Sequence, residues 1–233
     1  MIELYSFASG FGVVDPSPFV LKVDAYMRLA NIEYESFPSV DNLKKAPKGK
    51  LPFIMDGEKK IADSEFIISY LKEKFKVNLD SNLSVEQKSM AYLIGKSLDE
   101  NLYWCLVYSR WVKDETWVQV KKAFFGSMPF PLKFIVPPIA RKGVTSALYK
   151  QGLGRHSDEE IKIISDRTFQ SLSDLLGDKT YFFGDSPCTF DATAFGFLAQ
   201  FISVSLNNEI NDLARQYSNL VDYCSYINAT YYN

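Results

Sequence analysis

A serine between two prolines stands where a strand-like segment gives way to a helical pattern. Residues 15–20 read D-P-S-P-F-V, with Ser17 between the prolines. Serine is a preferred N-cap residue and proline is favoured at the first helical position, so Ser17-Pro18 predicts the start of a helix. A hydroxyl group at such a turn can also be catalytic. The residue types alone leave both roles open.

The histidine and cysteine content excludes several kinds of site. His156 is the single histidine and lies in G-R-H-S-D-E-E, a polar stretch that predicts an exposed or capping imidazole. A site with two or more histidine ligands is therefore excluded, and we expect no bound metal. Cys105, Cys188 and Cys224 are odd in number and far apart, without a C-x-x-C motif. They indicate free thiols in a reducing, cytoplasmic setting.

The overall composition is that of an ordinary globular protein. Hydrophobic residues make up 47% of the 233 residues, the aromatic share is 15%, and the net charge is −2. Because phosphate neutralisation needs clustered cations, we expect no nucleic-acid partner. The N-terminus lacks a secretory pattern, and no apolar run reaches the roughly 18 residues of a membrane-spanning helix. We therefore expect a cytoplasmic protein.

The first part of the chain mixes strand and helix signals. Strands are predicted near 2–7, 33–38, the L-P-F-I-M stretch and 59–62, and the D-G at 56–57 predicts a hairpin turn. Helical spacing of apolar residues predicts helices over 18–30 and 64–75. The order βαβ-ββα predicts an α+β domain over residues 1–77.

The second part has only helical patterns, over 84–112, 157–176, 188–205 and 209–230. It predicts an all-helical domain over 84–233. Residues 124–142 are apolar and carry four prolines, which exclude one continuous helix across them. We expect an irregular cover over the helical core; the alternatives are a lid over an apolar pocket, or a protein or membrane-surface contact aided by nearby lysines and Arg141.

Three short stretches together resemble the glutathione transferase superfamily. They are S-P-F-V at 17–20, K-L-P-F-I at 50–54 and A-D-S-E at 62–65. Within that superfamily, S-P-F-V-L-K-V-D-A-Y-M-R-L-A, Q-G-L-G-R-H-S and D-A-T-A-F-G are similar to the branch of failed-axon-connections and metaxin-like proteins. The resemblance covers essentially the whole chain. It implies a thioredoxin-like domain followed by an all-α domain, with glutathione as co-substrate.

The resemblance also implies a glutathione-binding role for Lys50, Leu51, Pro52, Asp63 and Ser64. Pro52 would be a cis-proline that presents the Leu51 backbone to the cysteinyl part of glutathione. Asp63 and Ser64, at a helix N-terminus, would hold the γ-glutamyl end. The alternatives are a trans proline that ends a loop and plain helix capping by Asp63 or Ser64.

Ser17 would occupy the first position of the thioredoxin-type C-x-x-C motif in this resemblance. Its hydroxyl could donate to the sulfur of glutathione, and the helix N-terminus would further favour the thiolate. Neither position 17 nor Val20 is cysteine, so dithiol–disulfide exchange at this site is excluded. Catalysis would activate a bound thiol that attacks an electrophile.

Further residues complete the predicted site. An aromatic set is the candidate lining of an apolar electrophile pocket, although core packing is the commoner role of such residues: Phe19, Tyr103, Trp104, Tyr108 and Trp111. In G-D-S-P-C-T-F-D we interpret Asp191 as structural, with Cys188 as a poor helix cap and Thr189 as an alternative cap.

Two functions remain open on the sequence alone. The first is a glutathione transferase that uses Ser17 to stabilise the thiolate. The second is a non-catalytic adaptor of the same fold that makes contacts through residues 124–142. A homodimer is an expectation from the family.

Overall fold

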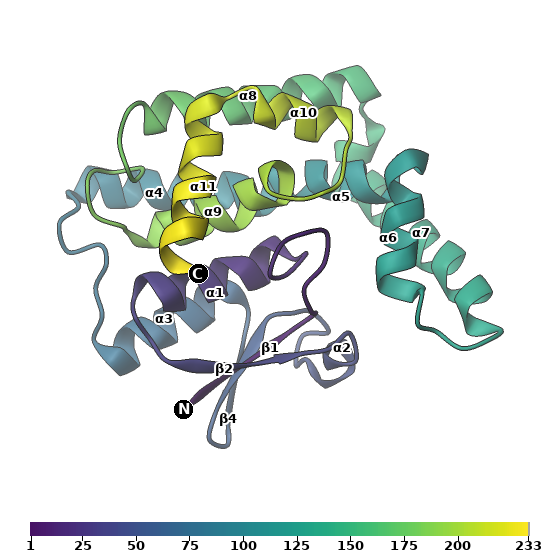
Figure 1. Cartoon of the computed structure of the whole chain (residues 1–233), viewed down its shortest axis with the longest axis horizontal. Helices are drawn as coiled ribbons and strands as arrows, with labels where there is room; N and C mark the ends of the chain where they lie inside the picture. The colour runs from purple at the N-terminus through teal and green to yellow at the C-terminus, as the bar shows by residue number, and fades with distance from the viewer. Residues whose placement is uncertain (233) are drawn as a thin grey trace.

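A four-stranded mixed sheet and eleven α-helices make up the part of the chain described here, residues 1–232 of a computed structural model. The strands are β1 (Ile2–Ser6), β2 (Tyr34–Pro38), β3 (Phe53–Asp56) and β4 (Lys59–Ala62). Their order is β2-β1-β3-β4, with β1 and β2 parallel and the other pairs antiparallel. Figure 1 shows this sheet at the opposite side of the molecule from α8 and α10.

Three helices belong to the strand-containing part: α1 (Pro18–Leu29), α2 (Asn42–Lys45) and α3 (Ser64–Phe75). The strands, α1 and α3 agree with the predicted α+β pattern, whereas the short α2 was not predicted. The helical part begins at Val85, so the expected boundary at 77–84 falls in the segment between α3 and α4. The remaining helices are α4 (Val85–Ser97), α5 (Tyr103–Trp111), α6 (Asp114–Phe125), α7 (Leu132–Gln151), α8 (Asp158–Leu176), α9 (Thr189–Ile202), α10 (Glu209–Arg215) and α11 (Ser218–Tyr231).

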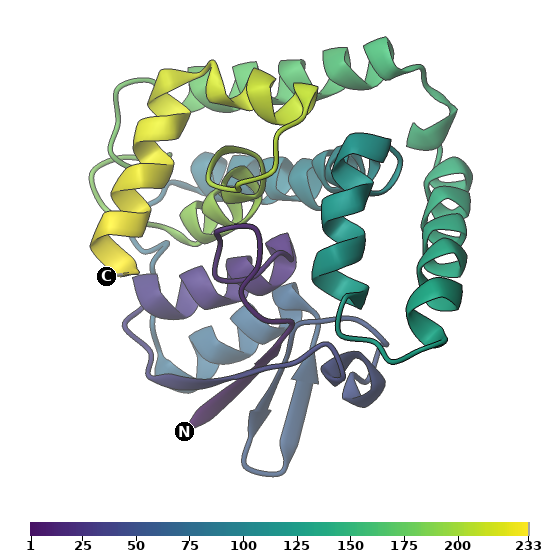
Figure 2. The ribbon, with the colours of Figure 1, turned by 45° about the vertical axis from the view of Figure 1, so that its right-hand side comes forward.

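The expectation of an irregular segment at 124–142 is wrong for its second half. A loop follows Phe125, but α7 then runs from Leu132 to Gln151 with Pro137 and Pro138 inside it. The two prolines each remove one helical hydrogen bond, yet their fixed φ is compatible with a helix. Figure 2 shows α6 and α7 as a hairpin at one end of the molecule. We call residues 114–151 the α6–α7 hairpin.

Two other helical predictions also need correction. The pattern over 209–230 forms two helices, because the chain leaves the helix at Gln216 and Tyr217 between α10 and α11. The pattern over 84–112 contains a π-helical turn, η1 (Leu98–Leu102), between α4 and α5. None of the helices within the described residues is long and apolar enough to cross a membrane.

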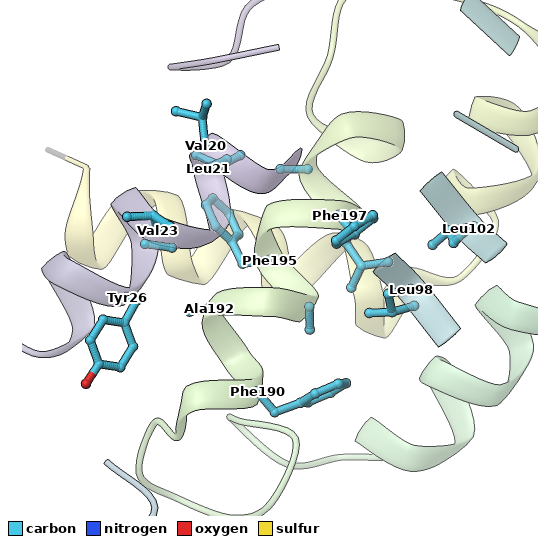
Figure 3. Close-up of a cluster of buried hydrophobic side chains, with 14 of the residues drawn as sticks. Val20, Leu21, Val23, Tyr26, Leu98, Leu102, Phe190, Ala192, Phe195 and Phe197 are labelled. Carbon is cyan, nitrogen blue, oxygen red and sulfur yellow. The ribbon is translucent and has the colours of Figure 1, made fainter. Parts of the chain in front are cut away.

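The core extends from the sheet into the helical part through the contact of α1 with α9. Figure 3 shows α1 beside α9, with Phe195 of α9 next to α1 and Phe197 on the other side of α9, toward Leu98 and Leu102. The contact is close because α9 has a glycine there. A Cβ atom at Gly196 would lie 2.8 Å from the backbone nitrogen of Lys22 and 2.9 Å from the backbone oxygen of Pro18. The two parts of the chain therefore pack backbone against backbone.

The start of α9 is held by two carboxylates. Asp191 accepts hydrogen bonds from the Cys188 and Phe182 N–H groups, at 2.8 and 3.0 Å. Cys188 is the N-cap residue. Thr189 does not cap: its N–H and hydroxyl both donate to Asp80, from the segment before α4. These contacts fit the structural role that we expected for Asp191.

Candidate active site

A cavity of about 350 Å³ contains all six residues expected to bind glutathione or its sulfur. They are Ser17, Lys50, Leu51, Pro52, Asp63 and Ser64. The lining also includes Phe7, Phe19, Leu43, Lys48, Glu65, Lys96, Asp99, Glu100, Tyr103 and Trp104. We call it the polar cavity. The sheet domain and the first long helix of the helical part thus share its walls.

Ser17 is the N-cap of α1, as its sequence context predicts. Its Oγ accepts a hydrogen bond from the Val20 N–H at 3.4 Å, and Pro18 follows at the first helical position. Within residues 1–232 no acceptor is found for the proton of the Ser17 hydroxyl. The hydroxyl group can therefore cap the helix as an acceptor and donate into the cavity at the same time.

The Leu51–Pro52 peptide bond is cis, as predicted. Leu51 is buried at the cavity wall and precedes the first residue of β3, Phe53. Its backbone N–H and C=O have no hydrogen-bond partner among the residues that the structure describes. Buried backbone groups are nearly always paired, so this edge can accept an extended, peptide-like ligand.

Asp63 has an unusual backbone conformation at the start of α3. Its φ is 85°, in the region that non-glycine residues seldom adopt, and such residues gather at ligand sites. The side chain caps α3 by accepting from the Glu65 N–H at 3.1 Å, and Lys48 lies 3.9 Å away. Together with Ser64, this helix N-terminus can bind a carboxylate beside a group that can accept an ammonium.

A four-charge cluster borders the polar cavity. Lys22 of α1 is buried and lies 3.2 Å from Asp99 of the π-helical turn, while Lys96 lies 2.8 Å from Glu65. Burial alone would raise the pKa of Glu65, but Lys22 and Lys96 outweigh it and lower that pKa. The cluster ties α1, α3 and the end of α4 together. No local pattern in the sequence predicts this cluster.

A second cavity of about 370 Å³ adjoins the first. The two cavities share Phe7, Ser17, Leu43 and Tyr103. Most of the other lining groups are apolar: Pro16, Pro18, Val40, Leu106, Val107, Arg110, Trp111, Phe124, Phe125, Met128 and Ala140. We call it the apolar cavity. Four of its residues come from the segment 124–142, for which a lid over an apolar pocket was one of the alternatives.

The predicted aromatic set divides between the two cavities. Phe19, Tyr103 and Trp104 line the polar cavity, and Tyr103 and Trp111 line the apolar cavity.

Tyr108 reaches neither cavity, and its hydroxyl donates instead to Asp158. Residues five apart on a helix point about 140° away from each other, at 100° per residue. A cavity on the face of α5 that carries Tyr103 therefore cannot be lined by Tyr108.

A buried carboxylate supports the loop that carries Ser17. Asp15 accepts hydrogen bonds from the N–H groups of Ser17 and Phe7, both at 2.8 Å. Burial raises the pKa of Asp15 to about 7, although the backbone hydrogen bonds oppose the rise. An aspartate side chain in a turn often accepts a hydrogen bond from the backbone N–H two residues on, so Asp15 in D-P-S was a signal for this contact. Asp15 was not among the residues predicted for the site.

Two residues of the helical part hold the same loop from the other side. Arg110 of α5 is buried and donates to the Pro16 carbonyl at 2.6 Å and to the Gln200 side chain at 2.8 Å. Gln200 of α9 donates to the Asp15 carbonyl at 2.9 Å. Burial lowers the pKa of Arg110 to about 10. These long-range contacts have no counterpart in the local sequence pattern.

The arrangement defines a protein with a thioredoxin-like half, a helical half and a cavity lined by both. Solved structures share this fold: the β-etherase LigF from Sphingobium sp. strain SYK-6 matches 98% of this chain and 95% of its own, with a TM-score of 0.67 at 17% identity. Residues 18–116 match the family model of the glutathione S-transferase N-terminal domain, and residues 165–227 match that of the C-terminal domain.

Curated relatives extend over the whole chain. The isoprene-epoxide–glutathione S-transferase of Rhodococcus sp. (strain AD45) is 31% identical, over 99% of both chains. Failed axon connections of Drosophila melanogaster is 32% identical over 86% of this chain and 50% of its own length. Metaxin-3 of Xenopus laevis is 30% identical over 100% of this chain and 77% of its own. The chain belongs to the glutathione S-transferase family.

Proposed function

We propose that this protein is a glutathione transferase that uses Ser17 to stabilise the thiolate of bound glutathione. One observation carries the proposal. The Ser17 hydroxyl, the unpaired Leu51 backbone and the Asp63–Ser64 helix end meet on one cavity. Glutathione needs those three kinds of partner, for its sulfur, its peptide backbone and its γ-glutamyl end.

The second substrate would be an apolar electrophile in the adjoining cavity. Ser17 lines both cavities, so a sulfur held beside its hydroxyl faces the apolar lining. The thiolate attacks the electrophilic carbon, a carbon–sulfur bond forms, and the leaving group or the opened epoxide oxygen takes up the electron pair. Proximity and thiolate stabilisation supply the rate, without a nucleophile from the protein.

Calorimetric titration with reduced glutathione tests the binding step. We expect saturable binding to the full chain, and weaker binding after Asp63→Ala. Tyr108→Phe is the matched control, because Tyr108 lies outside both cavities. No heat of binding at millimolar glutathione would overturn the proposal. Turnover is then measured with epoxides, aryl halides and enones, since one relative is named for an isoprene epoxide.

A non-catalytic adaptor is the second candidate function. It is supported by the similarity to failed axon connections and to metaxin-3, which carry no transferase name. In this case the α6–α7 hairpin would be the contact surface. Glutathione binding without conjugation of any electrophile in the screen would favour the adaptor. A homodimer and a cytoplasmic location remain predictions for either function.

A further inference from the structure

The outer surface of the α6–α7 hairpin exposes large apolar side chains. Phe130 is 79% exposed, Ile139 65% and Phe134 60%, and Leu132 and Ile135 are also exposed. All five lie in the loop before α7 or in its first eight residues; Leu132, Ile135 and Ile139 share one face of α7, whereas Phe134 faces another side. Five exposed apolar residues within ten positions form an unusual concentration on a protein surface.

The same hairpin is strongly basic. It contains six Lys or Arg residues and two acidic residues, Asp114 and Glu115 at the start of α6, although the whole chain has 26 basic and 28 acidic residues. Among them, Lys121, Lys122, Lys133 and Lys142 are exposed and form no ion pair in the described part of the chain. Arg141 is engaged with Asp114 and with carbonyl groups of the α5–α6 corner. The lysines are therefore free to meet an external anion.

A groove of about 450 Å³ runs between α6 and α7, on the side of α7 that carries Phe134. Trp117, Phe134 and the proline pair form its apolar lining. Lys121 and Lys142 lie on it as well. An anionic headgroup in the groove would have two lysines beside it and apolar side chains around it.

We propose that the α6–α7 hairpin docks on the surface of a lipid bilayer that contains anionic lipids. Exposed aromatic and aliphatic side chains insert at the headgroup level, and the surrounding lysines interact with the negative surface potential.

Charge complementarity favours this occupant over two others. A second copy seated patch against patch would bring two surfaces of net positive charge together. A nucleic acid would leave the aliphatic side chains of Leu132, Ile135 and Ile139 beside phosphates without apolar partners.

Docking would place the apolar cavity next to the lipid. Phe124, Phe125, Met128 and Ala140 of the same hairpin line that cavity. An apolar electrophile dissolved in the bilayer would therefore encounter the element that forms the cavity wall. The docking inference itself does not depend on the proposed transferase activity.

Vesicle co-sedimentation of the full chain tests the proposal. The vesicles are phosphatidylcholine alone, or phosphatidylcholine mixed with phosphatidylglycerol. We expect binding to the mixed vesicles that weakens with added salt, and little binding to phosphatidylcholine alone. Equal sedimentation with both vesicle types, or with neither, would overturn the proposal.

Charge variants locate the surface. Replacing two lysines in Lys133→Gln/Lys142→Gln should lower the partition coefficient roughly 30-fold, at about 1 kcal/mol for each basic residue near a charged membrane. The control Lys88→Gln/Arg167→Gln removes the same charge from α4 and α8 and should leave binding unchanged. Equal losses in both variants would show only a dependence on net charge and would refute the assignment to the hairpin.

Apolar variants test insertion separately. Phe130→Ser/Ile139→Ser should lower binding at least about tenfold, because burying one such side chain contributes about 1.5–3 kcal/mol. Ile163→Ser on α8, at a residue that is 50% exposed, is the control. Thermal unfolding of each variant checks the fold. If the double variant unfolds normally and binds like the wild type, insertion is refuted. Glutathione titration of the same variants should be unaffected, which separates this proposal from the proposed function.

Discussion

Replacing Ser17 by alanine separates helix capping from chemistry. The cap hydrogen bond from the Val20 N–H is long, 3.4 Å, compared with the usual 2.7–3.2 Å for this kind of bond. Loss of an N-cap typically costs about 0.5–2 kcal/mol, and the long distance favours the low end of that range. We therefore expect Ser17→Ala to lower the free energy of unfolding by only about 0.5–1 kcal/mol.

The effect on bound glutathione should be larger. A hydrogen bond to a charged group contributes about 1.5–3 kcal/mol, which corresponds to roughly 1–2 pKa units. Without the Ser17 hydroxyl, the pKa of the bound thiol should rise by that amount. At a pH below the pKa of the bound thiol in the wild-type complex, the conjugation rate should fall about tenfold to hundredfold. The dissociation constant of glutathione should change little, because Leu51, Asp63 and Ser64 still hold it.

The assay follows the thiolate absorbance of the glutathione complex against pH, together with conjugation rates and thermal unfolding. Ser157→Ala is the matched control. Ser157 caps α8 by accepting from the Glu160 N–H at 3.3 Å and lines neither cavity. We expect it to destabilise the fold at least as much as Ser17→Ala and to leave the thiol pKa unchanged. An unshifted thiol pKa in Ser17→Ala would refute the assignment and reduce Ser17 to a helix cap.

Three further substitutions test the loop before Ser17, the apolar cavity and the contact of α1 with α9. The pKa of Asp15 is about 7 in the folded protein, whereas an unfolded aspartate loses its proton near pH 4. The folded protein therefore keeps a proton that the unfolded chain loses between these two pH values. The free energy of unfolding should fall by up to about 4 kcal/mol from pH 4 to pH 7. Denaturant unfolding should show this decline in the wild type and lose it in Asp15→Asn. Trp111→Ala should raise the KM for the electrophile several-fold while calorimetry finds unchanged glutathione affinity; an equal effect of Tyr108→Phe would contradict the cavity assignment. Gly196→Ala should destabilise the fold by about 1–3 kcal/mol in thermal unfolding, because its Cβ would lie 2.8 Å from the Lys22 nitrogen; an unchanged Tm would contradict the close packing.

The elements predicted best are those whose ends carry local signals. The helices after Ser17 and Asp63 begin where the caps indicate, and the strand at 59–62 follows the D-G turn. Apolar spacing and caps are local properties of the chain, so the sequence reveals them directly. The same caps lie at the two polar ends of the candidate site, but it was the resemblance to the glutathione transferase superfamily that selected Ser17, Asp63 and Ser64 as site residues.

The errors arise where tertiary contacts decide. Pro137 and Pro138 argue against a helix locally, yet α7 includes both. Spacing on α5 could not show which face meets the cavities, so Tyr108 was grouped with Tyr103 although the two side chains point apart. Arg110 is an ordinary helix residue in the sequence, and only the fold places its guanidinium on the Pro16 carbonyl.

The geometry of Ser17 connects these two kinds of information. Its cap requires only α1, but its loop is held by Asp15 within the first half and by Arg110 and Gln200 of the second half. The capping function would therefore survive in any context that forms α1. Positioning of the hydroxyl against both cavities requires the α5 and α9 contacts, since Arg110 reaches the loop through its Pro16 carbonyl. A thiolate-stabilising Ser17 is thus a property of the assembled two-part fold, whereas a helix-capping Ser17 is a property of the short stretch D-P-S-P-F-V alone.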